Sequence, residues 1–214
     1  GRDAADKLAV LAGALFGLTV ETASLHVRGI DTVTVADLAA ARALGGALKP
    51  AVVAQCDGRG LAAFAGPCWV PASHPLASVH GRDNTIVIEG PHIGRVTFSG
   101  AGAGPDITAA TLIDDAIEAS AEGTGTVRRE WRGVRRVTVP NTGWFAHIRG
   151  AGAAQAALIA LQLDQAGLAP RAIVATEGGL GALLESGSEG VVFAVLTALR
   201  AQGMRAAAWR ALHD

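Results

Sequence analysis

The chain has 214 residues, enough for one large domain or two small ones with a sizeable core. Half of the residues are hydrophobic and only 4% are aromatic, while a net charge of -1 provides no field that would attract nucleic acid or an anionic membrane. Two cysteines make no disulfide framework, and no signal peptide or apolar run of spanning length is visible, so we expect a soluble, cytoplasmic protein.

The first predicted helix runs from residue 3 to 18, with leucines at positions 8, 11, 15 and 18 forming an apolar stripe and Gly17 near its C-terminal cap. A second helix follows Thr34, since Asp37 stands three residues later as in a capping box, and it stops at the glycine pair 45–46. Because the chain begins with Gly1 and not methionine, we expect it to be part of a longer protein.

Strands are predicted over residues 49–55 and 60–71, separated by a turn at 56–60, and over 84–89 and 95–98, which form a hairpin. The glycine run 100–104 then leads into a helix that starts at Pro105, a residue suited to the first helical position, and ends near 121. Together these segments predict an α+β domain over residues 1–122, a mixed sheet with helices packed on one face.

Glycines and arginines interrupt the apolar pattern over residues 123–136, which is typical of a linker. Beyond it the pattern predicts a strand (144–149), a helix (153–166), a strand (171–175), a strand (191–195), a helix (197–202) and a last strand (205–211). This βαββαβ order predicts a ferredoxin-like domain over residues 137–214.

Asp3 and Lys7 are the first candidates for chemistry, since they lie four residues apart on one face of the first helix. The simpler interpretation is an exposed ion pair that stabilises the helix by about 0.3–0.5 kcal/mol. The functional interpretation places Lys7 in a partly desolvated cleft, where it delivers a proton to a substrate.

The glycine run 100–104 is the second candidate, because glycines before a helix let backbone N–H groups approach an anion. A tight turn needed only for packing is the alternative interpretation. The spacing is neither that of a dinucleotide-binding fingerprint nor that of a P-loop. The six histidines are dispersed, so no metal site is predicted, and no serine stands in a hydrolase motif.

Taken in order, these segments resemble the homoserine dehydrogenase family. The resemblance rests on the opening Gly-Arg-Asp-Ala-Ala-Asp-Lys-Leu-Ala-Val-Leu-Ala, on Val-Arg-Gly-Ile (27–30), on Asp-Leu-Ala-Ala-Ala-Arg-Ala-Leu-Gly (37–45) and on His-Pro-Leu-Ala-Ser-Val (74–79). It continues with Gly-Ala-Gly-Ala-Gly (100–104) and Thr-Ala-Ala (108–110), so it covers residues 1 to about 121.

The resemblance implies reduction of aspartate semialdehyde to homoserine with NAD(P)H, on the route to threonine and methionine. Lys7 falls on the family's catalytic proton donor, Asp3 on the acid that holds the substrate and that lysine, and Gly104 on the last glycine of a cofactor-binding loop. The family's nucleotide-binding domain has no counterpart in the chain, so we expect the cofactor to be held mostly elsewhere and the chain alone to be inactive.

By the same resemblance, residues 137–214 correspond to an ACT-like regulatory domain that takes an amino-acid effector such as threonine, and the protein is expected to be a homodimer or homotetramer. An Asp-Arg-Pro-Gly signature is expected after the first strand of that domain, but the chain has Arg-Gly-Ala-Gly (149–152) there. An alternative function is a non-catalytic amino-acid sensor or scaffold that keeps the dehydrogenase fold.

Overall fold

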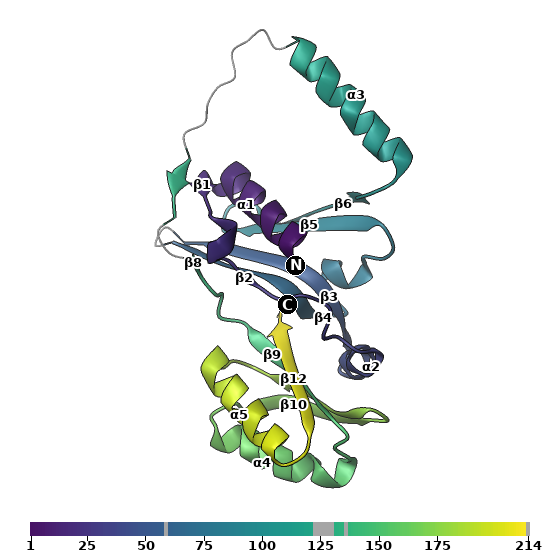
Figure 1. Ribbon diagram of the computed structural model, residues 1–214, viewed down its shortest axis with the longest axis vertical. Coiled ribbons are helices and arrows are strands. Elements are labelled where there is room, and N and C mark those ends of the chain that lie inside the picture. Colours follow the sequence, from purple (N-terminus) through teal and green to yellow (C-terminus); the bar gives the residue numbers. More distant parts are fainter. Residues whose placement is uncertain (58–59, 122–130, 135–136, 213–214) are drawn as a thin grey trace. The chain divides into compact units, whose positions relative to one another are not determined.

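The computed structural model describes residues 1–57, 60–121, 131–134 and 137–212 (Figure 1). The chain forms two compact units, one comprising Gly1–Ser73 with Trp131–Asp214 and the other comprising His74–Glu130. Among the described residues, no helix is both long enough and apolar enough to cross a membrane.

Helix α1 (Arg2–Phe16) opens the first unit and buries one face. Ala5, Leu8 and Ala12 are 4%, 1% and 1% exposed, and they pack with Leu61 and Ala63 in one core cluster. The helix ends two residues earlier than the sequence predicts, because Gly17 adopts the left-handed conformation (φ 66°) and its N–H caps the last turn.

Helix α2 (Val35–Ala43) begins with the predicted capping box. The Asp37 carboxylate accepts hydrogen bonds from the backbone N–H and from the hydroxyl of Thr34, each at 2.7 Å. These bonds fix the N-terminal end of the helix. Further along it, Ala40 and Ala41 are fully buried against the sheet.

Strand β4 is the centre of the large sheet of the first unit. Strand β3 pairs with it antiparallel along its whole length, while β8, β2 and β12 follow one another in parallel along its other edge. The predicted linker 123–136 lies mostly outside the described residues, as does part of the turn at 56–60, but β7 falls within that linker and pairs with β1. The strands of this part are β1 (Leu18–Thr19), β2 (His26–Val27), β3 (Gly46–Cys56), β4 (Leu61–Pro71), β7 (Arg132–Gly133) and β8 (Val137–Thr138).

The C-terminal part of this unit has the predicted βαββαβ order (Figure 1). Its strands lie in the order β10-β11-β9-β12, with all neighbours antiparallel, which is the ferredoxin-like arrangement. We call residues 143–211 the C-terminal module. Its elements are β9 (Gly143–Arg149), α4 (Ala156–Gln165), β10 (Pro170–Thr176), β11 (Gly179–Leu184), α5 (Glu189–Ala201) and β12 (Arg205–Ala211).

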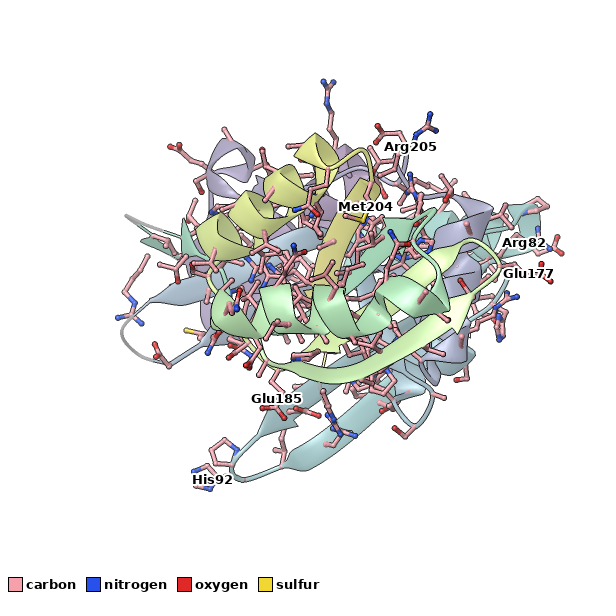
Figure 2. All side chains as sticks on the ribbon, turned by 90° about the horizontal axis from the view of Figure 1, so that it is seen from below. Arg82, His92, Glu177, Glu185, Met204 and Arg205 are labelled. Carbon is pink, nitrogen blue, oxygen red and sulfur yellow. The ribbon has the colours of Figure 1, made fainter. Side chains whose placement is uncertain are left out.

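Strand β9 is buried on both faces because helices cover both sides of the module sheet. Trp144, Ala146 and Ile148 pack with residues of α4 and α5, which lie side by side over the strands in Figure 2. Phe145, one residue out of phase, packs in a separate cluster with Ala40 and Ala41 of α2. The odd-numbered residues of β4 face both α1 and α2, so these two helices share one face of the sheet, as predicted.

One prediction within the module is wrong. Residues 191–195, predicted as a strand, lie inside helix α5, and the third strand is β11. The Ser188 hydroxyl caps the helix by accepting the N–H of Val191, and Val192, Leu196 and Leu199 recur at helical spacing and are 1–2% exposed. Helical burial therefore overrides the local strand propensity.

The second unit contains the predicted hairpin, β5 (Asp83–Gly90) with β6 (Gly94–Ala101), and helix α3 (Pro105–Ala121), which begins at the predicted proline. An ion pair between Arg95 and Glu89 and a hydroxyl contact of 2.9 Å between Thr85 and Ser99 join the two strands. Three 3-10 turns complete the described elements: Thr22–Ser24, Pro75–Ser78 and Ala153–Gln155.

Candidate functional site

Asp3 and Lys7 lie together on the exposed face of α1. The Lys7 ammonium is 2.9 Å from the Asp3 carboxylate, and the two side chains are 64% and 83% exposed. On the opposite face, Leu8 is anchored in the core. The pair is in contact, as its i, i+4 spacing predicts, and its exposure matches the simpler interpretation of an exposed ion pair more closely than a partly desolvated cleft.

Gly104 forms the last residue of a tight turn in the second unit. It has a φ of +139°, which side chains rarely adopt, and its carbonyl accepts the N–H of Thr108 at the start of α3. The carbonyl of Arg82 accepts the N–H of Gly102 at 2.7 Å, and a Cβ atom at Gly104 would lie 3.5 Å from an Arg82 guanidinium nitrogen. The glycine turn therefore brings the positive end of a helix next to a cation.

A polar hollow of about 310 Å³ also lies in the second unit, and it includes the first glycine of the run. Four of the six residues that line it have polar or charged side chains: Ser78, Asp83, Thr85 and Ser99.

Asp37 is the centre of a buried polar cluster that the sequence did not reveal. Besides capping α2, its carboxylate accepts hydrogen bonds from His147 Nδ1 at 2.6 Å and from Arg149 Nε at 3.0 Å, both on β9. Because an ionised carboxylate can only accept, the imidazole proton lies on Nδ1. The one signal in the sequence was the capping box, which explains only the contacts with Thr34.

Burial alone would raise the pKa of Asp37, but the hydrogen bonds from His147, Arg149 and Thr34 outweigh it and hold that pKa well below its usual value. Asp37 and His147 are both fully buried, and His147 Nε2 has no hydrogen-bond partner among the described residues. The cluster thus joins the α2 end of the N-terminal half to the C-terminal module through an ionised group.

These features describe an α+β protein with a ferredoxin-like C-terminal module. The same fold occurs in solved homoserine dehydrogenases: one from Thiobacillus denitrificans aligns with a TM-score of 0.81 at 22% identity, over 98% of this chain and 52% of that one. One from S. aureus aligns with a TM-score of 0.71 at 18% identity, over 100% of this chain and 53% of that one.

The sequence profile of homoserine dehydrogenase matches residues 1–117, so the chain belongs to the homoserine dehydrogenase family. The homoserine dehydrogenase of Bacillus subtilis is 34% identical over 117 residues, and that of Mycobacterium leprae is 38% identical over 125 residues. These matches cover 55% and 56% of this chain but only 27% and 28% of the relatives, so the chain corresponds to part of their length.

Proposed function

We propose that the chain forms the substrate-binding part of a homoserine dehydrogenase, which reduces L-aspartate 4-semialdehyde to L-homoserine. The observation that carries the proposal is the exposed Lys7–Asp3 pair on α1, in the segment that the family profile matches. Reducing an aldehyde requires a hydride at carbon and a proton at oxygen, and NAD(P)H supplies the hydride when bound.

Lys7 then acts as the general acid. Its ammonium donates a proton to the aldehyde oxygen as the carbon–oxygen double bond becomes a single bond, and the amine that remains takes a proton from water, since the side chain is largely exposed. Asp3 holds the ammonium in position and accepts hydrogen bonds from the polar end of the substrate.

Gly104 is the residue that we propose for contact with the cofactor. A turn that consists only of glycine and alanine, the N-terminal end of α3 and the nearby Arg82 guanidinium fit the negative charge of a nicotinamide dinucleotide. In this proposal most of the cofactor is held by residues outside the chain.

We also propose that residues 137–214 form a regulatory domain for an amino-acid effector such as threonine, in a homodimer or homotetramer. The ferredoxin-like strand order supports the proposal. Isothermal titration with threonine and analytical ultracentrifugation test the two parts. Threonine binding without any homoserine oxidation by the intact protein would instead favour a non-catalytic sensor.

The catalytic proposal is tested with the intact enzyme that carries this chain, by following NAD(P)H absorbance during homoserine oxidation. Lys7→Ala is expected to lower kcat by about 10²–10⁴, the usual contribution of a positioned acid, with the KM for the cofactor nearly unchanged. Arg2→Ala removes a neighbouring exposed cation from the same helix and should leave kcat unchanged. Equal rates for wild type and Lys7→Ala would exclude Lys7 as the acid.

A further inference from the structure

A small hollow of about 130 Å³ lies in the first unit, between the N-terminal strands and the C-terminal module. Strands β2 and β4 form one side, and β9, β12 and the first turn of α5 form the other. Its wall combines apolar and charged groups, among them Phe64, Pro67, Trp144, Arg28, Glu189 and Arg210.

Two of the three charged groups already neutralise each other. Arg210 Nη2 donates to the Glu189 carboxylate at 2.8 Å, and the guanidinium lies over the Trp144 ring, 4.0 Å from its centroid. Arg210 is only 9% exposed, so its position is fixed by the fold. The pair contributes no net charge to the hollow.

Arg28 is the third charged group, and no carboxylate pairs with it among the described residues. Its Nη1 donates to the carbonyl of Ala208 at 2.8 Å, and its guanidinium lies 5.3 Å from the centroid of the Phe193 ring. No described residue accepts a hydrogen bond from its Nε or Nη2. Part of the guanidinium fork is therefore available to a ligand.

Arg28 is an exposed residue, so water still reaches its cation. Partial burial lowers its pKa most strongly, Glu189 raises it, and the neighbouring guanidinium groups of Arg210 and Arg200 lower it further. With Arg210 paired to Glu189, the charge of Arg28 is left without an ion-pair partner among the described residues that line the hollow. A negative charge in the hollow would offset that charge.

We propose that this hollow is a binding site for a small monocarboxylate, which Arg28 holds through its free N–H groups. A planar carboxylate matches the guanidinium fork, and the apolar walls of Phe64 and Trp144 suit a short aliphatic chain. A single negative charge balances the one unpaired cation. A dianion such as phosphate would meet repulsion from Glu189.

The site is distinct from the substrate face of α1 and from the loop that follows β9. It lies where β9 begins, at Trp144, whereas the 149–152 loop lies at the other end of that strand. The backbone of Arg28 nevertheless lies near Gly1, the residue before α1, since a Cβ atom added to Gly1 would lie 3.0 Å from the Arg28 carbonyl oxygen. Binding of a carboxylate at this hollow does not require the proposed catalytic role of Lys7.

Calorimetric titration of the chain with sodium acetate, at constant ionic strength, tests the site. We expect a dissociation constant in the millimolar range, as suits a ligand of four non-hydrogen atoms held by one charged group. Arg28→Gln should weaken acetate binding by about tenfold or more, since it removes a charged hydrogen bond. Arg171→Gln, which removes an exposed arginine of β10, should not change it.

Further experiments distinguish the kinds of ligand and include a measurement that does not depend on the folding of a variant. Glu189→Gln should strengthen acetate binding, because it removes a negative charge from the hollow. Glycine distinguishes two kinds of ligand. If Glu189→Gln weakens glycine binding, the carboxylate of Glu189 holds the ammonium group and the ligand is an amino acid; if the variant strengthens glycine binding, the ligand is a simple carboxylate. In unmodified chain, acetate should shift the indole N–H resonance of Trp144 and leave that of Trp131 in place. No acetate binding at 50 mM (about tenfold above the expected constant), equal binding to Arg28→Gln, or a preference for phosphate would overturn the proposal.

Discussion

Replacing Asp37 by asparagine removes the charge at the centre of the buried cluster and keeps the size of the side chain. The Asp37 carboxylate accepts from Thr34, His147 and Arg149, and it is fully buried. The amide retains one acceptor oxygen and turns an NH₂ group toward these donors. His147 and Arg149 then lose the group that compensates their burial.

The expected cost is about 3 kcal/mol, the lower end of the range for breaking a buried ion pair by removing one partner. If the free energy of unfolding falls by about 3 kcal/mol per molar urea, the urea midpoint of Asp37→Asn should lie about 1 M below that of the wild type. Tryptophan fluorescence is a suitable assay, because all four tryptophans lie in the first unit and Trp69 donates from Nε1 to the Ala41 carbonyl on α2. Asp6→Asn, at an exposed position of α1, is the matched control, and we expect it to change the free energy of unfolding by no more than about 0.5 kcal/mol.

The same variant has a defined pH signature. Because the pKa of folded Asp37 lies below its unfolded value, its contribution to stability is fully present above about pH 4 and is lost as the pH falls toward the folded pKa. The stability difference between wild type and Asp37→Asn should therefore shrink below about pH 4. Two results would refute the reasoning: a urea midpoint of Asp37→Asn within 0.2 M (about 0.6 kcal/mol) of the wild-type midpoint at pH 7, or a stability difference between the two proteins that grows in acid.

Two further predictions concern groups fixed by packing. Burial raises the pKa of Cys68 to about 12, whereas Cys56 is exposed. A thiol reagent at pH 8 should therefore modify only Cys56 in the native protein and both cysteines in urea. Modification of two thiols without denaturant would contradict the burial of Cys68. Gly46→Ala should lower the free energy of unfolding by about 1–3 kcal/mol in urea titrations, because its Cβ atom would overlap the buried Trp69 ring; Gly133→Ala, with open space around it, should be close to neutral.

Local signals in the sequence predicted most of the elements. The capping box of Thr34 and Asp37, the left-handed Gly17 and the start of α3 at Pro105 each depend on neighbours within a few residues. The βαββαβ order was also correct, although the third strand was misplaced and the second helix begins at Glu189, before the predicted start at residue 197. There the β-branched side chains of 191–195 favoured a strand, and only packing against the module sheet selects the helix.

The polar clusters could not be predicted, because their members are far apart in the sequence. Asp37 and His147 are separated by 110 residues, and Arg28 and the Ala208 carbonyl by 180. A single sequence contains no information on such pairings. The Lys7–Asp3 contact was predictable because it is local, whereas the catalytic role that we propose for it rests on membership of the family.

The last strand has a consequence for any attempt to separate the module from the rest. Strand β12 pairs with β9 on one side and with β4 on the other, through Arg210 with Cys68 and Ala211 with Trp69. Removing β12 would leave the end of β4 without its hydrogen-bond partners. The exposed strand edge could then pair with other chains. We therefore expect proteolysis or gene truncation near residue 140 to yield fragments that aggregate. We also expect the C-terminal module and the N-terminal part of the first unit to unfold in one cooperative step.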